Sequence, residues 1–406
     1  MKKESTMTDL HSLNPKNSPE KITVCFFSPY PPENDGISKY TERLVKNFPE
    51  NVEISIFARR GNAVQGEYGV FRTLSFRIKD IIATYKKLTD LHPDVIHVQY
   101  TIPLYGFYLI VLLPLLVLAR AGLKSKLVIT FHEVKREIEI LKFLGTLHYE
   151  IVSSLVNKIY VHTHEAKVIL VKRCHVAEAK ISVIPHGTFS LEASPNGEER
   201  IRKTFKIYKE NIILFFGYIH TNKGIEFLVD AYSKLLLNHS LKETTQLLIV
   251  GSVRPRQGIF KIFGNLDAKY FEKIKTQIKA RGIQDNVMLI DYVPDDLIYS
   301  FLKMASCIVL PYTRSEQSGV LNLAISTQTP IIASNIGGFG ETLKDVGVLV
   351  KPGDSDAIAE SLKEIIQNPG YAKKLSNGYL LLNDKLQPTE VVRVMMDDYR
   401  KLLCKE

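Results

Sequence analysis

The sequence predicts an α/β protein of two domains, each built on a parallel sheet, that face each other across a deep cleft. Short apolar or β-branched runs alternate with amphipathic helical patterns along the chain, as in strand-helix-strand units. This alternation stops near Gly187 and restarts at Asn211, after a polar stretch. The length of 406 residues suffices for two domains with separate cores.

The first half of the chain predicts an N-terminal domain over residues 21–190. Residues 22–28 are expected to form a buried strand, followed by a Pro-rich loop and a helix that begins at Ile37. Residues 1–20 are polar, lack the apolar core of a secretory signal, and are expected to form a flexible tail. Further strands are expected at 52–58, 94–99, 126–131, 158–163 and 181–185.

The second half predicts a C-terminal domain over residues 203–384, joined to the first by a polar linker at 191–202. Its first helix is expected at about 224–236, and the last segment, 385–406, is expected to be a helix that packs back toward the N-terminal domain. Strand C-termini and helix N-termini of the two domains would converge on the cleft. Strands are expected at 211–217, 246–251, 287–293, 307–311, 330–334 and 346–352.

The composition predicts a soluble globular protein with an anionic partner. Hydrophobic residues make up 45% of the chain, charged residues 24%, and the formal net charge is +10. Nucleotide diphosphates and lipid headgroups fit this charge. No nucleic-acid partner is expected, because the Lys/Arg excess is spread along the chain and no nucleic-acid module is present. Four scattered cysteines indicate neither a disulfide framework nor a zinc site and fit a reducing cytoplasm.

Residues 102–119 are the membrane-like segment of the sequence. They carry no charge but fall short of the roughly 20 residues that span a bilayer. Pro103, Gly106 and Pro114 interrupt the run, and an expected strand lies on either side of it. A buried crossover helix is therefore expected rather than a membrane span. Docking of this region onto the inner face of a membrane stays open.

The segment Tyr312–Gly338 contains the most informative pattern. A Ser318-Gly319 pair opens an apolar helical run, which leads to a β-branched strand. Gly319 has no Cβ, so an anion can approach the backbone there, and the N–H groups of Ser318, Gly319 and Val320 lie at a helix start. Such a site suits a diphosphate. A plain strand-turn-helix is the alternative interpretation.

One triplet, Asp354-Ser355-Asp356, has the D-x-D form of a metal-binding motif. It directly precedes a run with helical periodicity, so Asp354 or Ser355 is expected to cap that helix instead. No other carboxylate or histidine cluster has metal-ligand spacing in the sequence. No metal is expected.

Six motifs spread over the chain carry a resemblance. Together they resemble those of family-four retaining glycosyltransferases, and the resemblance runs from about Ile22 to the last helix. It implies the GT-B fold, in which two Rossmann-like domains hold a nucleotide-sugar in the cleft between them. The motifs are SPYPPENDGISKY at 28–40, VITFHEV at 128–134, VIPHGTF at 183–189, FFGYIHTNKGIEFLVDAY at 215–232, DYVPDDLIYSFLKMASCIVLPY at 291–312 and SGVL at 318–321.

The resemblance assigns roles to individual residues. Lys223 would neutralise the departing diphosphate, His132 would bond to the donor sugar at the reaction centre, and Glu316 would lie near the sugar hydroxyls. A surface lysine and a structural histidine are the alternative interpretations of Lys223 and His132. The expected donor-binding residues are Gly36, Ile37, Gly217, Tyr218, Ser318, Gly319 and Val320.

The chain departs from the family pattern at two positions. Members carry two glutamates separated by seven residues, and the second bonds the ribose hydroxyls. Leu323 or Ala324 stands at that second position here, depending on the alignment, so nucleoside recognition differs unless a group such as Glu341 compensates. The arginine that usually follows the strand glycine is replaced by Tyr218.

The resemblance implies metal-independent transfer of a hexose from a UDP or GDP sugar to a hydroxyl of a glycan or lipid-linked acceptor, without a cofactor. The apolar segment and the amphipathic stretch from Lys135 make peripheral membrane contact plausible. A nucleotide-sugar epimerase and a non-catalytic partner subunit stay open as alternatives, the second because of the missing glutamate. A dehydrogenase is not expected, because no G-x-G-x-x-G follows the first strand.

Overall fold

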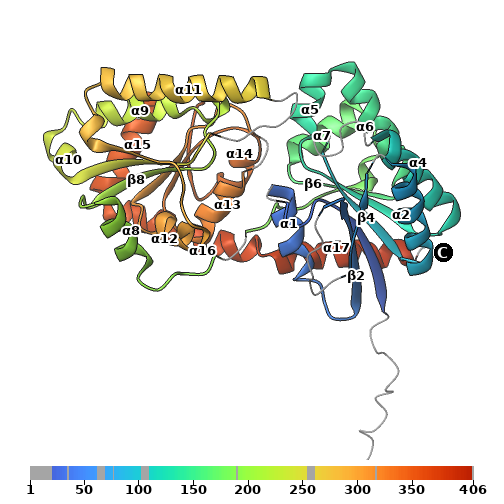
Figure 1. Cartoon of the computed structure of the whole chain (residues 1–406). Coiled ribbons are helices and arrows are strands. Elements are labelled where there is room, and N and C mark those ends of the chain that lie inside the picture. The colour runs from blue at the N-terminus through green and yellow to red at the C-terminus, as the bar shows by residue number, and fades with distance from the viewer. Residues whose placement is uncertain are drawn as a thin grey trace, which may run out of the picture.

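The structure, a computed structural model, describes residues 21–33, 36–61, 69–75, 77–101, 109–188, 191–253, 261–315 and 318–404. These residues form two α/β domains that lie side by side, each with helices packed around a parallel sheet (Figure 1). The last helix, α17 (Pro388–Leu403), leaves the C-terminal domain and runs along the N-terminal one (Figure 1). The two-domain parallel α/β fold expected from the sequence is confirmed.

The N-terminal domain contains a seven-stranded sheet in the order β3-β2-β1-β4-β5-β6-β7, with all neighbouring strands parallel. The strands are β1 (Ile22–Phe27), β2 (Val52–Arg59), β3 (Gly69–Leu74), β4 (Val95–Tyr100), β5 (Lys126–Phe131), β6 (Lys158–Val161) and β7 (Ile181–Val183). The helices are α1 (Gly36–Val45), α2 (Ile78–Leu91), α4 (Leu109–Gly122), α5 (Val134–Leu141), α6 (Phe143–Leu155) and α7 (His164–Arg173).

The C-terminal domain repeats this arrangement with a six-stranded parallel sheet in the order β10-β9-β8-β11-β12-β13. Its strands are β8 (Asn211–Phe216), β9 (Thr245–Val250), β10 (Val287–Ile290), β11 (Cys307–Leu310), β12 (Ile331–Ser334) and β13 (Val348–Val350). Its helices are α8 (Gly197–Phe205), α9 (Ile225–Leu235), α10 (His239–Thr244), α11 (Lys261–Ala280), α12 (Ile298–Lys303), α13 (Gly319–Ser326), α14 (Gly337–Leu343), α15 (Ser355–Gln367) and α16 (Pro369–Lys385).

The strand order explains where a ligand can bind. In each sheet the first strand of the domain is central, and the chain winds outward from it in both directions. Parallel sheets covered on both faces need strands that are apolar throughout, and β4 and β9 are buried along their whole length. The crevice in such sheets lies beyond the carboxyl ends of the central strands.

Two segments differ from expectation. Strand β3 was not expected, because it is a half-exposed edge strand that begins at a glycine and lacks a continuous apolar run. The expected linker at 191–202 is partly helical: α8 begins at Gly197, with Glu198 and Glu199 in its first turn, where acidic groups stabilise a helix. Ile201 of α8 lies in the core of the C-terminal domain, so that domain begins earlier than 203.

Helix α17 is anchored in the N-terminal domain by both apolar and polar contacts. Its Met395 is fully buried in a cluster with the central strands of that domain. Tyr399 Oη lies 2.5 Å from Nδ1 of the buried His97 on β4. Asp398 pairs with Lys158 Nζ at 3.2 Å and accepts a hydrogen bond from Ser182 at 3.1 Å. The last helix thus belongs to the core of the first domain.

The apolar segment 102–119 was expected to contain a buried crossover helix. Residues 102–108 lie outside the described part of the chain. Helix α4 connects the neighbouring strands β4 and β5, and its Leu116 and Ala119 are buried in the domain core. Within the described ranges, no helix is both long and apolar enough to cross a bilayer.

The D-x-D triplet caps a helix, as expected. Asp354 is the N-cap of α15, and its carboxylate accepts a hydrogen bond from the N–H of Ala357 at 3.0 Å. The capping interpretation is confirmed.

Candidate active site

Residues that follow the central strands of the two sheets lie where the two domains face each other (Figure 1). His132 follows β5 and His162 follows β6 in the N-terminal domain, whereas Gly217 follows β8 and Tyr312 follows β11 in the C-terminal domain. A hydrogen bond across the cleft joins Asn322 of α13 to His186 at 3.1 Å, so the two halves of the site are in direct contact.

The start of α13 offers backbone donors to a ligand. Ser318 caps the helix, and its hydroxyl accepts a hydrogen bond from the N–H of Leu321 at 3.4 Å. Among the described residues, the N–H groups of Gly319 and Val320 have no hydrogen-bond partner. A Cβ at Gly319 would meet nothing within 4 Å. The two free amides, the positive end of the helix and open space together suit an anion.

The turn after β8 brings a glycine against this helix start. Gly217 has φ +121°, and a Cβ there would lie 3.2 Å from Cγ2 of Val320. A Cβ at Gly251, after the adjacent β9, would lie only 2.0 Å from the carbonyl oxygen of Gly217. Glycine is favoured at 217 by its positive φ, and at 251 it is required because a Cβ would collide with the backbone. Tyr218, which takes the place of the family arginine, is 46% exposed.

Lys223 lies beside the segment that leads to α13. It ends a short 3₁₀ turn, Thr221–Lys223, and its ammonium is 3.6 Å from the centre of the Tyr312 ring. The turn is held by a hydrogen bond from the N–H of Thr313 to the carbonyl of Asn222 at 3.0 Å. Within the described ranges no carboxylate pairs with Lys223, and its ammonium is stabilised by the face of the Tyr312 ring.

His132 lies in a buried polar cluster of the N-terminal domain. Its Nε2 is 2.8 Å from Oε1 of Gln99, and its Nδ1 is 3.3 Å from Nε2 of His162. The Tyr40 ring of α1 packs edge-on against His132, with ring centres 5.3 Å apart. Burial, with His162 and His186 nearby, lowers the pKa of His132 well below its usual value. The imidazole is therefore neutral at pH 7 and can donate or accept a hydrogen bond.

Helix α1 connects the glycine-containing first loop to this cluster. Gly36, its first residue, is exposed, and a Cβ there would meet nothing within 4 Å; Ile37 is half-buried. Lys39 of α1 lies 3.8 Å from Asp295 of the C-terminal domain. The first turn of α1, the helix that also carries Tyr40, thus faces the C-terminal domain.

The glutamate positions can be only partly described. Glu316 lies outside the described residues. Ala324 is fully buried in the domain core and Leu323 packs against that core, so neither can replace a ribose-binding carboxylate. Glu341 accepts hydrogen bonds from the backbone N–H groups at the start of α7, at 2.8 and 3.0 Å, so both its oxygens are engaged.

Sequence reasoning missed several residues of this site: Tyr40, Gln99, His162, His186 and Asn322. They lie on elements far apart in the chain, and no local motif connects them. The register of β5 and β6, in which Phe131 pairs with Val161, places the next residue of each strand side by side. Strand pairing, which the sequence does not display, brings His132 and His162 together.

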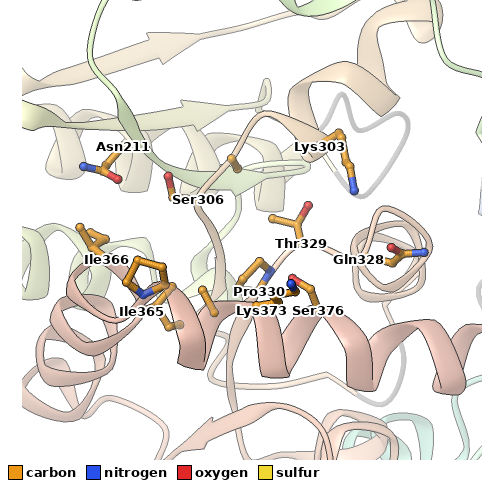
Figure 2. A pocket seen from close by; sticks show the side chains of 13 residues that line it. Asn211, Lys303, Ser306, Gln328, Thr329, Pro330, Ile365, Ile366, Lys373 and Ser376 are labelled. Atoms are coloured by element: carbon orange, nitrogen blue, oxygen red, sulfur yellow. The ribbon is translucent and has the colours of Figure 1, made fainter.

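A separate pocket of about 340 Å³ lies at the opposite edge of the C-terminal sheet. Asn211, Ser306 and Pro330, at or just before the amino ends of β8, β11 and β12, line it together with α15 and α16 (Figure 2). Because ligands of such sheets bind beyond the carboxyl ends of the strands, this pocket is not the candidate active site.

Relatives of known sequence support this arrangement. Residues 34–188 match the family described as Glycosyltransferase Family 4, and residues 197–379 match Glycosyl transferases group 1. An uncharacterised glycosyltransferase of Methanocaldococcus jannaschii is 28% identical over 49% of this chain and 48% of its own length. A phosphatidyl-myo-inositol mannosyltransferase of Mycobacterium leprae is 28% identical over 46% of this chain and 44% of its own. The chain thus matches about half the length of these curated relatives.

Solved structures show the same fold over nearly the whole chain. A glycosyltransferase from Rickettsia africae superposes with a TM-score of 0.71 at 17% identity, covering 95% of this chain and 100% of its own. HepE of Anabaena, in complex with UDP, superposes with a TM-score of 0.73 at 14% identity, covering 94% of this chain and 100% of its own. From the two family matches and this fold, the chain belongs to the family-four type of glycosyltransferases with the GT-B architecture.

Proposed function

We propose that the protein transfers a hexose from a nucleotide-diphosphate sugar to a hydroxyl of a glycan or lipid-linked acceptor, with retention of the anomeric configuration. Two observations carry this proposal. The Lys223 ammonium lies on the Tyr312 ring, in the segment that leads to α13, and has no carboxylate partner among the described residues. The amides of Gly319 and Val320 at the start of α13 have no partner among those residues either, and the turn at Gly217 packs against Val320. Such a set neutralises the charge of a departing diphosphate.

The donor is a UDP or GDP sugar. Structural neighbours from Anabaena were solved with UDP and with UDP-glucose, which favours a nucleotide-sugar in the equivalent cleft. The diphosphate would lie against α13 and Lys223, with the start of α1, Gly36 and Ile37, approaching it from the other domain. Neither a metal nor a cofactor is needed, because an ammonium and helix dipoles supply the positive charge.

The proposed reaction exchanges two bonds at the anomeric carbon. The bond from this carbon to the diphosphate oxygen breaks, and a bond to the acceptor oxygen forms on the same face of the sugar. The acceptor proton moves to the departing diphosphate oxygen, so no protein base is required. Neutral His132 would hold a sugar hydroxyl, Glu316 would lie near the others, and positioning would supply much of the rate.

The acceptor would bind against the N-terminal domain, at its contact with a membrane surface. The corner between α5 and α6 exposes Ile140, Phe143 and Leu144 to 66, 74 and 68%, next to the exposed Lys142. Exposed apolar side chains of this kind insert into the interface of a bilayer, and a neighbouring cation is attracted to anionic lipid headgroups. We expect the protein to float with anionic phospholipid vesicles, and Phe143→Ser/Leu144→Ser to reduce this binding. Equal flotation of the variant, or none by either protein, would remove the membrane part.

Two alternative functions can be distinguished experimentally from glycosyl transfer. A non-catalytic partner subunit would bind the donor weakly, which fits the absence of a carboxylate at Leu323 and Ala324. A nucleotide-sugar epimerase would use the same diphosphate site but no acceptor. Both predict that no new glycosidic bond forms.

The test combines donor binding with product analysis. Thermal unfolding is measured with UDP, GDP and their hexose derivatives, and only a compound that binds the folded protein raises the midpoint temperature. A ligand at 100 times its Kd stabilises the folded state by about 2.7 kcal/mol. The stabilising donor is then incubated with glycan and polyprenyl-linked acceptors, and NMR of the product gives the anomeric configuration. No stabilisation by any activated sugar at millimolar concentration would overturn the proposal.

A further inference from the structure

Three imidazoles meet at the edge of the N-terminal sheet. His132 follows β5, His162 follows β6, and His186 lies in the segment after β7; these strands are neighbours in the sheet. One ring nitrogen of each histidine lies within 4.8 Å of the other two. His132 and His162 are buried, and His186 is half-buried. These groups come from strand ends 30 and 24 residues apart, so the fold alone brings them together.

In each of the three rings, one nitrogen has a hydrogen-bond partner outside the histidine cluster. His132 Nε2 lies 2.8 Å from Oε1 of Gln99, and His162 Nδ1 lies 3.2 Å from the carbonyl oxygen of Ile184. His186 Nδ1 lies 3.1 Å from Nδ2 of Asn322. Rotation of the Asn322 carboxamide by 180° would place its oxygen there instead, so that it accepts a hydrogen bond from His186. Metal-bound histidines have such partners on the nitrogen that faces away from the ion.

A lone pair of His162 faces His132. A carbonyl oxygen only accepts, so the single proton of neutral His162 must lie on Nδ1, toward Ile184, and His162 Nε2 carries a lone pair. His132 Nδ1 lies 3.3 Å from this nitrogen. The orientation of the Gln99 carboxamide decides which nitrogen of His132 carries its proton: when Oε1 of Gln99 accepts from His132 Nε2, His132 Nδ1 also carries a lone pair. In that arrangement His132 Nδ1 and His162 Nε2 can bind the same cation.

The spacing fits a transition metal. Two nitrogens bound to tetrahedral Zn²⁺ at 2.0–2.1 Å are about 3.4 Å apart, which matches the 3.3 Å between His132 Nδ1 and His162 Nε2. The ligand nitrogen of His186 lies up to 4.8 Å from the other two, so the His186 ring must move closer to complete a three-histidine set. Because His186 is half-buried, a water molecule can take the fourth ligand position.

We infer that His132, His162 and His186 bind one divalent transition-metal ion such as Zn²⁺, and that the bound ion inhibits the enzyme. Inhibition follows because the metal occupies a nitrogen of His132 and fixes its ring, so this part rests on the proposed function. The transfer reaction itself needs no metal, so the ion acts as an inhibitor and not as a cofactor.

The binding test uses the full chain without an affinity tag. Zn²⁺ is titrated by calorimetry in competition with a chelator, and Co²⁺ is titrated by visible absorption. We expect one equivalent of Zn²⁺ and the intense absorption of four- or five-coordinate Co²⁺. His162→Ala and His186→Ala should each weaken Zn²⁺ binding at least tenfold, and Gln99→Leu by roughly tenfold, as for other partners of metal ligands.

His175→Ala is the matched control, because His175 is 75% exposed beside Glu150 and lies outside the cluster. It should leave Zn²⁺ binding unchanged. Unchanged binding in the two cluster variants, loss in His175→Ala, or the weak spectrum of octahedral Co²⁺ in the unsubstituted protein would overturn the site. The spectrum needs no substitution, so it decides the question even if a variant does not fold.

The inhibition test is separate from binding. Added Zn²⁺ should stop hexose transfer, and a chelator should restore it. Binding without inhibition overturns the regulatory part while the site stands. If no transfer is found with any donor, the proposed function fails, but the titrations still test the metal site.

Discussion

The carboxylate of Glu341 accepts a 2.8 Å hydrogen bond from the backbone N–H of His164, although the two residues belong to different domains. Its second oxygen accepts from Glu165 at 3.0 Å, so one carboxylate caps α7 from across the cleft. A negative group at a helix N-terminus is stabilised by the free N–H groups and the helix dipole. This contact favours the closed arrangement of the two domains.

Replacement of this carboxylate should shift the protein toward an open form. For Glu341→Ala we expect a loss of about 1 kcal/mol from the closed state, or roughly fivefold in the ratio of open to closed molecules. The radius of gyration from small-angle scattering should increase, and donor affinity should fall. Glu360→Ala, which removes an exposed glutamate of α15, is the control. Equal scattering and affinity in both variants would contradict the role of Glu341.

A substitution at Gly319 should weaken donor binding without changing the stability of the fold. Since a Cβ there meets nothing within 4 Å and no positive φ is required, Gly319→Ala should leave the unfolding midpoint unchanged. If a diphosphate approaches this backbone, the added methyl group should weaken donor binding at least severalfold. Gly224→Ala is the contrasting variant: at φ +62° its Cβ would lie 2.0 Å from the carbonyl oxygen of Pro311, so it should destabilise the fold. Calorimetry and thermal unfolding measure the two effects.

Lys223 should matter for transfer far more than for stability. Lys223→Met keeps the apolar stem against Tyr312 but removes the charge, so thermal unfolding should change little. Loss of one group that stabilises transition-state charge costs on the order of 100-fold in kcat. Lys223→Arg should recover part of this loss. A methionine variant with full kcat would exclude Lys223 from leaving-group stabilisation.

Acid should destabilise the N-terminal domain through His97. Its ring is buried against Tyr399, Thr130, Tyr160 and Phe26, and burial lowers its pKa to about 3. In the unfolded chain the pKa of His97 is near 6.5, so below that pH the unfolded chain binds a proton that the folded chain does not. The free energy of unfolding therefore falls as pH drops from about 6.5 toward 3. This contribution amounts to about 1.4 kcal/mol per pH unit.

The check is chemical unfolding at pH 7 and pH 5. His97→Asn should be less stable than the unsubstituted protein at pH 7, because it loses the contacts to Tyr399 and Thr130. The difference between the two proteins should shrink at pH 5, because the variant lacks this titrating group. A difference that stays constant between the two pH values would show that His97 does not titrate as its burial requires.

Apolar runs predicted most of this fold, because parallel strands covered on both faces must be continuously hydrophobic. β4 and β9 are of that kind. Edge strand β3 is half-exposed and has no such run, so it was not expected. The acidic start of α8 falls in the segment predicted to be a linker, because polar composition does not separate a surface helix from a loop.

The site was predictable only where a local motif carries it. The start of α13 and the turn at Lys223 each lie within one short motif, so the sequence could propose both as parts of a diphosphate site. Among the described residues, Gly319 and Val320 have amides without a partner and Lys223 has no carboxylate partner, and their role stays a prediction. The contact of His132 with His162 depends on strand register, and that of His186 with Asn322 on domain closure. Neither relationship leaves a pattern in the sequence.

The backbone passes between the domains twice, near Thr188 on the way out and near Leu386 on the way back. The N–H of Thr188 donates a 2.7 Å hydrogen bond to the carbonyl of Leu386, so the two passages are fastened together. Helix α17 then continues into the core of the first domain. Two crossings that are hydrogen-bonded to each other should restrict the relative motion of the domains more than a single crossing would. We therefore expect α13 to meet the same histidines whenever the domains come together.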